Sequence, residues 1–543
     1  MYNFIYMNKK VVTYAISVVI VILSFIFFKN NSKKNDCYIE NLGPAVVTLN
    51  PLNCCDASSV RVIYDIYEGL MDYDNDGNLV NTGCSSYEKS EDGLTYIFHL
   101  RENAKWSNGD DVTADDYVYS LRRCLNPNTL CQSFLLQLFD IKNAKAISKG
   151  ELKVEELGVY ADDKYTLRIE LENLNSEFIY YVTLPNYYPV HRKSVERYGL
   201  TAFSKVENIV SNGPYIVTSW VANSNITLHK NDKYWDKDNV KISDVKFLMI
   251  SDGSVDLNTF RTGNEDMTSY ALPRKSIEEY KKEFGDQCQV YDVLCQHRIV
   301  FNLNKEKYQD VNVRKAFSIA LDREKIVKSL ITCSPSYTII PENTSNGIYK
   351  DDIKDFEEFD WINKDINERN KLAQDLIRQA GYSKENPLKI DIYFFSNDDM
   401  KKMASTLQDI FTRAFDGLVI CTLSFDDWST YLSNITKGNF DIAWSCWLAD
   451  YNIPSNLSIL YYSENDNNYG SYKDDEFDYY FKLSLTSNKE DYISYQKRCN
   501  KIATQSFCAI PFSIDKRIRL KKSNIKGFKG NALDRIKTKL LYK

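Results

Sequence analysis

The chain has 543 residues, of which 43% are hydrophobic and 26% charged, and its formal net charge is -6. Such a composition is typical of a globular protein, and the length predicts two or three sub-domains instead of a single core. The negative charge, and the lack of a long basic run after residue 40, argue against nucleic acid as a partner.

The N-terminal part contains an uncharged apolar run, VVTYAISVVIVILSFIFF, at residues 11–28. As a helix this run would span about 27 Å, which is enough to cross the hydrocarbon core of a bilayer. No A-x-A cleavage site follows, so we expect an uncleaved anchor in the cytoplasmic membrane, with a lipid on Cys37 as the alternative. Lysines flank the run on both sides, so the positive-inside rule does not assign its orientation.

The first part of the body shows strand and helix signals in turn. YDNDGNL (73–79) carries a glycine turn between apolar stretches, and GLTYIFHLR (93–101) alternates as a half-buried strand does. Thr113 is a good N-cap, and Asp115 and Asp116 would fill the first turn of the helix that follows. The apolar face of this helix is expected to hold Val118, Leu121 and Leu125.

Later segments continue the alternation of strands and helices. The pattern predicts a strand at 165–171, a hairpin at 213–231, a helix pair at 310–330 with Asp322 capping the second helix, a helix at 370–382 ended by Gly381, and a strand at 388–395. The alternation is most regular after about residue 295, which is typical of an α/β lobe.

The sequence offers no pattern for catalysis or for a metal. We find no HExxH, P-loop, GxSxG or dinucleotide fingerprint, and therefore expect no catalytic residues. No two histidines lie at metal-ligand spacing, so neither a metal nor a cofactor is expected. Cys124/Cys131 and Cys288/Cys295 could each close a short disulfide loop, but we expect mostly free, buried thiols among the 13 cysteines.

Residues 446–454, CWLADYNIP, place an acid among apolar residues. Asp450 lies close in sequence to Trp447, Tyr451 and Pro454. An ammonium group taken out of water needs a compensating charge, and a carboxylate in apolar company supplies it with a charge-assisted hydrogen bond. A turn-capping role before YNIP is the alternative.

Several phrases of the chain occur together, in order, over roughly residues 40–540. They are YEGLMDYDNDGNL, SEDGLTYIFHLRENAKWSNGDDVTADDYVYSLRRCLNP, NGPYIVTSW, NDKYWD, VNVRKAFSIALDREKIV, AGY, WLADYNIP and IPFSIDKRIRLKKSNIKGF. As an ordered set they resemble the extracytoplasmic solute-binding proteins of oligopeptide ABC importers (solute-binding protein family 5, peptide/nickel-binding type).

This resemblance implies an α/β fold of the two-lobed periplasmic-binding-protein kind (type II, cluster C), with a two-stranded hinge and an extra sub-domain on the first lobe. On that pattern lobe I is discontinuous and holds about 38–65, 208–295 and 505–543, after a membrane anchor or signal segment at 1–37. The extra sub-domain would be 66–207 and lobe II 296–504. The lobes would close over a ligand by a hinge motion.

The resemblance also implies a function without catalysis. The chain would be a monomeric receptor on the extracytoplasmic side, binding short peptides and delivering them to ABC transporter permease subunits. In peptide-binding members the aspartate of W-x-A-D-Y receives the ligand's α-ammonium, and here that position is Asp450. Trp447 and Trp428 match two tryptophans near the peptide side chains, with core packing as their alternative role.

Other cleft residues follow from the same resemblance. The backbone of Cys446 and Leu448 would pair with the peptide as a strand does, which ignores side-chain identity. Ala57, Tyr270 and Ala271 are further expected cleft residues.

The chain also departs from the family pattern. Some relatives hold the peptide carboxylate with arginines between the two tryptophans, whereas here Lys437 is the only cation of that stretch. Preferred peptide length and sequence are therefore open. A binder of nickel or haem, a sensor of a peptide signal, and a membrane-anchored hydrolase are the alternative functions, and the last has no supporting motif.

Overall fold

The computed structural model describes residues 37–54, 56–129, 138–269, 271–273, 275–330, 333–350 and 352–543. The expected anchor at 11–28 lies outside these residues. Within the described ranges, no helix combines the length and the apolar character needed to cross a membrane. Cys288 and Cys295 form no disulfide, and Cys131 is another residue that is not described.

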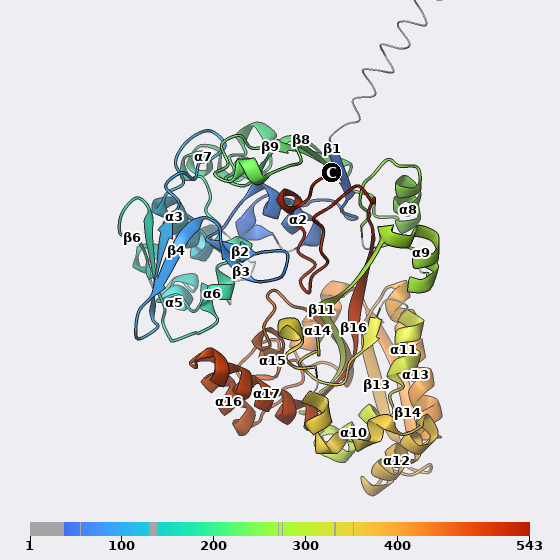
Figure 1. Cartoon of the computed structure of the whole chain (residues 1–543). Helices are drawn as coiled ribbons and strands as arrows, with labels where there is room; N and C mark the ends of the chain where they lie inside the picture. Colours follow the sequence, from blue (N-terminus) through green and yellow to red (C-terminus); the bar gives the residue numbers. More distant parts are fainter. Residues whose placement is uncertain are drawn as a thin grey trace, which may run out of the picture.

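The first lobe is built around a four-stranded sheet (Figure 1). The strand order is β1 (Cys37–Asn41), β10 (Asp244–Leu248), β9 (Asn225–Lys230) and β8 (Tyr215–Val221). β1 runs parallel to β10, and β8 and β9 form the hairpin that the sequence predicts at 213–231. Cys37, the alternative lipid attachment point, is the first residue of β1 and is half-buried.

A second four-stranded sheet, all antiparallel, lies beside the first lobe. Its order is β4 (Cys84–Lys89), β5 (Thr95–Leu100), β7 (Thr166–Glu170) and β6 (Val159–Ala161), with the small hairpin β2 (Met71–Tyr73) and β3 (Leu79–Asn81) next to it. Gly77 has a φ of 80° in the turn of that hairpin, as the sequence predicts. Helix α3 (Ala114–Leu125) begins after Thr113, whose capping box with Asp116 fixes the start.

The second lobe contains a six-stranded sheet. Its order is β12 (Cys333–Pro335), β16 (Ala509–Leu520), β11 (Cys288–Phe301), β15 (Ile442–Leu448), β13 (Leu388–Phe395) and β14 (Val419–Asp426). Four helices of this lobe, α10 (Val311–Ala320), α11 (Arg323–Leu330), α12 (Ile366–Gln379) and α13 (Asp398–Phe415), contact one another and the sheet.

Helix boundaries that the sequence predicts in the second lobe can be compared with the structure. Asp322 accepts a hydrogen bond from the Lys325 amide at 3.0 Å and so caps α11 as predicted. Gly381 follows α12 with a φ of 91°, which confirms it as the end of that helix. The start at residue 370 was wrong, because Asp365 caps α12 and the helix begins at Ile366.

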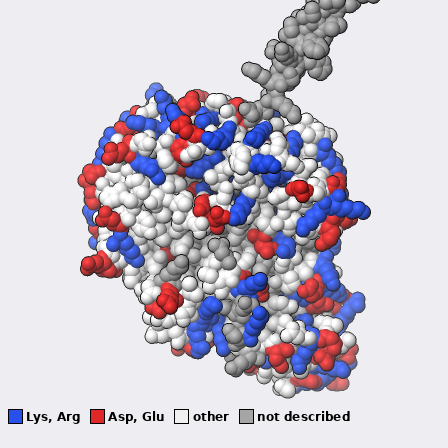
Figure 2. All heavy atoms as spheres, viewed as in Figure 1, with Lys and Arg blue, Asp and Glu red and all other residues white. Residues whose placement is uncertain are grey.

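The remaining helices are short or lie around the two lobes. Their bounds are α2 (Ala57–Ile66), α5 (Ala144–Ser148), α6 (Phe178–Tyr181), α7 (Arg192–Tyr198), α8 (Gly253–Arg261), α9 (Ile277–Phe284), α14 (Trp428–Thr436), α15 (Ser455–Ser458), α16 (Asp475–Leu485) and α17 (Lys489–Gln505). Acidic and basic side chains are interspersed over the face shown in Figure 2, as expected for a chain with a small net charge.

The long strands β11 and β16 connect the lobes (Figure 1). They pair antiparallel from Cys288↔Leu520 to Val300↔Ala509. One end packs with α8 and α9 in a small core that includes Phe260, Tyr280 and Leu520, and the other end enters the six-stranded sheet. The pairing shifts register between Asp292 and Gln296, where the strands pass from one environment to the other.

Candidate functional site

Four of the predicted site residues line one cavity of about 640 Å³. Cys446, Trp447 and Leu448 end strand β15, and Asp450 follows in the adjoining loop. The opposite wall comes from the sub-domain that carries β4–β7, and the remaining wall from helical segments after β15. The residues of these two walls are Phe139, Asp140, Asn175, Glu177, Tyr181, Tyr451, Asn456, Ile459, Tyr462, Glu464, Asn465, Asn467, Phe481 and Leu485.

Asp450 is held in place through its own backbone. Its amide donates a hydrogen bond to Asn456 Oδ1 at 3.2 Å, and Trp447 Nε1 donates to the same oxygen at 2.9 Å. Asn456 is 2% exposed, so one buried side-chain amide holds both the Trp447 side chain and the Asp450 backbone. The N-cap of the next helix, α15, is Pro454, so Asp450 does not cap it.

The Asp450 carboxyl lies in a low-dielectric setting. Burial raises its pKa to about 6, against smaller lowering effects from the Asn456 side chain and the charge of Arg535. The Arg535 guanidinium is paired with Asp72 Oδ1 at 3.0 Å and lies over the Tyr64 ring. Among the residues that the structure describes, Asp450 has no ion-pair partner of its own.

Two further acids share the cavity. Burial raises the pKa of Asp140 to about 6 and that of Glu177 to about 7. Both come from the sub-domain, far from Asp450 in the sequence, and sequence reasoning missed them together with Asn456. The walls therefore favour a ligand that brings positive charge.

The outer edge of β15 is open at the cavity. The Ala449 amide donates to the Leu294 carbonyl at 2.8 Å, which fixes the alternation of hydrogen bonding with β11. In an antiparallel pair the residues between such bonded pairs direct N–H and C=O away from the partner strand. Cys446 and Leu448 are in this position, opposite His297 and Cys295.

Strand β13, on the other side of β15, does not cover these groups. Within the described chain it pairs with β15 at Ile442 and Ala443 and goes no further. Tyr431 donates its hydroxyl to the Trp444 carbonyl just beyond that point. The backbone groups of Cys446 and Leu448 are therefore available to an extended ligand.

Trp428 lies outside this cavity. It is the first residue of α14, is 54% exposed, and contacts the Phe395 ring edge-on at 5.1 Å between centroids. Phe395 in turn contacts Trp444 of β15 at 5.4 Å. Such exposure does not fit core packing for Trp428, whereas Trp447 is half-buried and packs against the hydrophobic core of the second lobe.

Two of the remaining predicted residues, Ala57 and Ala271, are not brought to this cavity. Ala57 is the exposed first residue of α2, and Ala271 is exposed, with its carbonyl close to Gly253 at the start of α8. Neither lines the cavity around Asp450. Tyr270 lies outside the described residues.

Comparisons with known proteins agree with this arrangement. The model of the family "Bacterial extracellular solute-binding proteins, family 5 Middle" matches residues 79–469. The periplasmic oligopeptide-binding protein OppA of Salmonella typhimurium is 32% identical over 513 residues, covering 93% of this chain and 92% of the relative.

Two solved structures share the fold over nearly the whole chain. Haemophilus influenzae OppA in complex with the peptide RPPGFSPFR superposes with a TM-score of 0.76 at 30% identity, covering 94% of this chain and 99% of that one. The unliganded open form of the periplasmic murein tripeptide-binding protein MppA gives a TM-score of 0.80 at 26% identity, covering 94% and 97%.

Proposed function

The chain belongs to the bacterial extracellular solute-binding proteins of family 5, and from this premise we propose that it binds short peptides between its lobes and delivers them to the permease of an ABC importer. One observation carries the proposal. Asp450, a carboxylate without a cation partner among the described residues, lies two residues after the end of a strand whose backbone edge is open at Cys446 and Leu448. A peptide's α-ammonium and extended backbone complement these two features together.

Each part of the site has a distinct role in this proposal. Asp450 accepts the α-ammonium, and Cys446 and Leu448 hydrogen-bond the ligand backbone. Trp447 and the exposed Trp428 contact side chains through apolar surface and bridging water, which tolerates many sequences. Specificity is then set more by the amine and the backbone than by any one side chain.

The wider arrangement is proposed on the family pattern. The binding region lies on the extracytoplasmic side as a monomer without catalytic activity, anchored through residues 11–28 or by a lipid on Cys37. Lobe I comprises 38–65, 208–295 and 505–543, the extra sub-domain 66–207 and lobe II 296–504. The hydrogen bond from Lys543 Nζ to the Cys37 carbonyl, at 2.9 Å, supports placing both ends of the body in one lobe.

Calorimetry of the purified full chain tests the proposal. We expect heat of binding with mixed tri- to hexapeptides and far weaker binding of free amino acids, which offer almost no backbone for pairing. Nickel and haem serve as comparison ligands. Heat with either of these, and none with any peptide, would overturn the peptide assignment.

Import and sensing are separated by a transport experiment. Uptake of a labelled peptide that requires both this chain and a permease supports delivery. Binding without any dependence of uptake on this chain would instead favour a sensor of a peptide signal.

A further inference from the structure

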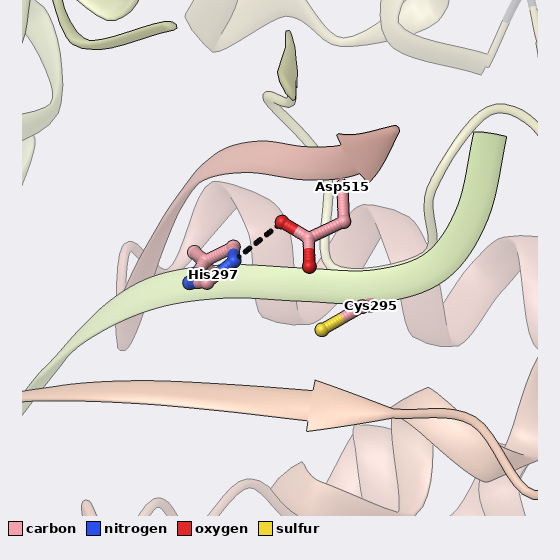
Figure 3. Close-up of side chains that lie close together, drawn as sticks. All are labelled: Cys295, His297 and Asp515. Atoms are coloured by element: carbon pink, nitrogen blue, oxygen red, sulfur yellow. Dashed lines mark hydrogen bonds and ion pairs between the residues drawn. The ribbon is translucent and has the colours of Figure 1, made fainter. Parts of the chain in front are cut away.

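Three potential metal ligands meet where the hinge strands enter the second lobe (Figure 3). Cys295 and His297 are two residues apart on β11, so their side chains leave the same face of the strand, and Asp515 comes from β16. One ligand atom from each lies within 4.8 Å of the others. His297 Nε2 is 2.8 Å from Asp515 Oδ1.

Two further thiols reach the same group. Cys333 on β12 pairs with Asp515 across the sheet, and its thiol donates to Asp515 Oδ1 at 3.4 Å. Cys446 on β15 lies opposite His297, and its thiol hydrogen-bonds with the Cys295 thiol. Three thiols, one imidazole and one carboxylate therefore converge from four adjacent strands, β12, β16, β11 and β15.

We propose that Cys295, His297 and Asp515 hold a Zn²⁺ ion, with the thiolate of Cys333 or Cys446 completing a tetrahedral site. Zinc is borderline-soft and prefers thiolate and imidazole ligands, whereas magnesium and calcium prefer all-oxygen sites. Tetrahedral bond lengths of about 2.0 to 2.3 Å place ligand atoms roughly 3.3 to 3.8 Å apart. His297 Nε2 and Asp515 Oδ1, at 2.8 Å, lie just below this range, and all three ligand atoms lie within 4.8 Å of one another, so side-chain movements are needed to bring them all to bonding distance.

The surroundings suit a closed site. Cys295 is 7% exposed and His297 is 9% exposed, so little water reaches the ligands. Two thiolates, a carboxylate and a neutral imidazole around Zn²⁺ leave one negative charge, and Arg517 lies 3.2 Å from the second oxygen of Asp515 to balance it. That contact also orients the carboxylate, as hydrogen-bond partners of metal-binding side chains do.

An ion at this position would affect the stiffness of the hinge. It would tie both hinge strands, β11 and β16, to their neighbours at the point where the register between them shifts. Cys446 belongs to the same cluster and to the strand edge that faces the cavity. A bound ion would therefore stiffen the base of the hinge and the strand beside the cavity.

Cobalt titration of the full chain, reduced and stripped of metal by a chelator, tests the site. Co²⁺ in a tetrahedral thiolate site gives visible absorption, and we expect saturation at one ion per chain and displacement by Zn²⁺. The variants Cys295→Ser, His297→Ala and Asp515→Asn should lose roughly 100-fold or more in Co²⁺ affinity. Single variants of Cys333 and Cys446 identify the fourth ligand.

Matched controls lie elsewhere in the chain. His229 pairs with Asp244 at 2.8 Å on the exposed surface, and Cys499 is buried in α17. His229→Ala and Cys499→Ser should bind Co²⁺ as the unmodified chain does. Circular dichroism checks the fold of each variant, and Zn²⁺ should raise the melting temperature of the unmodified chain and the controls alone.

Two results would overturn the proposal. One is Co²⁺ uptake that is absent, or equal in the unmodified chain and in all three ligand variants. The other is a disulfide between Cys295 and Cys446 in the protein as isolated, shown by peptide mass mapping, because it would consume a required ligand.

Discussion

Asp450 is positioned by neutral groups and not by a cation. Asn456 fixes its backbone, and Arg535, whose charge lowers the pKa of the carboxyl, is already paired with Asp72. A half-buried carboxylate of this kind gains most from a ligand that brings its own positive charge. On the proposed function, the amine of the peptide supplies that charge.

The variant Asp450→Asn isolates this charge. Asn keeps the shape and can still accept a hydrogen bond, so we expect a loss of about 2 to 5 kcal/mol in binding free energy for peptides with a free amine. N-acetylated peptides should bind almost equally to both proteins. Calorimetry with each of the two proteins and each of the two peptide forms gives the coupling energy between the Asp450 charge and the peptide amine. Coupling below about 0.5 kcal/mol in a folded variant would mean that the amine is held elsewhere.

Peptide affinity should also depend on pH with a defined sign. The pKa of the Asp450 carboxyl is about 6 without ligand, and a bound ammonium stabilises the ionised form. Binding below pH 6 must therefore remove a proton first. We expect affinity for free-amine peptides to fall as the pH decreases through about 6, approaching tenfold per pH unit.

The same pH series on Asp450→Asn is the control. Asp140 and Glu177 lie in the same cavity, with pKa values of about 6 and about 7, and they contribute their own pH dependence. The difference between the pH dependence of affinity in the unmodified chain and in Asp450→Asn is the contribution of Asp450. Parallel curves for both proteins would contradict the assigned role.

The sequence could group Asp450, Trp447, Cys446 and Leu448, which line one cavity, because they lie within five consecutive positions of one recognisable phrase. It missed Asp140, Glu177 and the zinc cluster for the opposite reason. The cluster draws on residues 295, 297, 333, 446 and 515, which four strands bring together. Spacing rules for metal sites use only residues that are close in the sequence, so they do not detect ligands that the fold brings together from distant positions.

Individual strands and helices were predicted best where one face meets water. β5, α3 and β13 show the alternation or capping that marks a half-buried element. The bounds of β5 and β13 lie within two residues of the prediction, and α3 begins directly after the predicted cap, Thr113. β11 is harder to predict, because every residue of Val293–Phe301 is buried and the segment therefore shows no alternation of polar and apolar residues. The strand that forms half of the hinge was thus the least visible in the sequence.

The open edge of β15 predicts which ligand amides matter. Successive amides of an extended peptide point to opposite sides, so only alternate ones face Cys446 and Leu448. N-methylation of those amides removes a donor and adds bulk, and each hydrogen bond lost costs about 0.5 to 1.5 kcal/mol. We expect a period of two in the affinities of a singly N-methylated tetra- or pentapeptide series.

The unmethylated peptide and its acetylated form complete this series. A uniform small effect of methylation at every position would show that the ligand backbone does not pair with β15. A large effect at the first residue alone would report steric interference with the amine at Asp450 instead.

The two lobes contact each other away from the hinge as well as through it. The Ser176 amide of the sub-domain donates to the Leu485 carbonyl at 2.7 Å, and the Tyr181 ring lies 5.2 Å from that of Tyr451. These contacts border the cavity, so a wall from each part faces the ligand. A hinge opening would break these contacts, and a closure would re-form them around a bound ligand.

Ligand binding should therefore change the size of the whole molecule. Peptide adds contacts to both walls and favours the closed arrangement, in which Tyr181 and Tyr451 touch. The fraction of closed molecules therefore rises, by an amount set by how much more tightly the closed state binds peptide than the open state does. We expect X-ray scattering to show a smaller radius of gyration at saturating peptide. Burial of the apolar walls should also make the heat-capacity change of binding negative.

Two variants connect this closure to the contacts that cause it. Tyr181→Ala removes a wall contact without touching Asp450, so it should leave a larger radius at saturating peptide and speed dissociation more than it slows association. Asp450→Asn should reach the same closed radius, but only at higher peptide concentration. A radius that stays unchanged in the unmodified chain at saturation would contradict hinge closure, and binding would then occur in a fixed cavity.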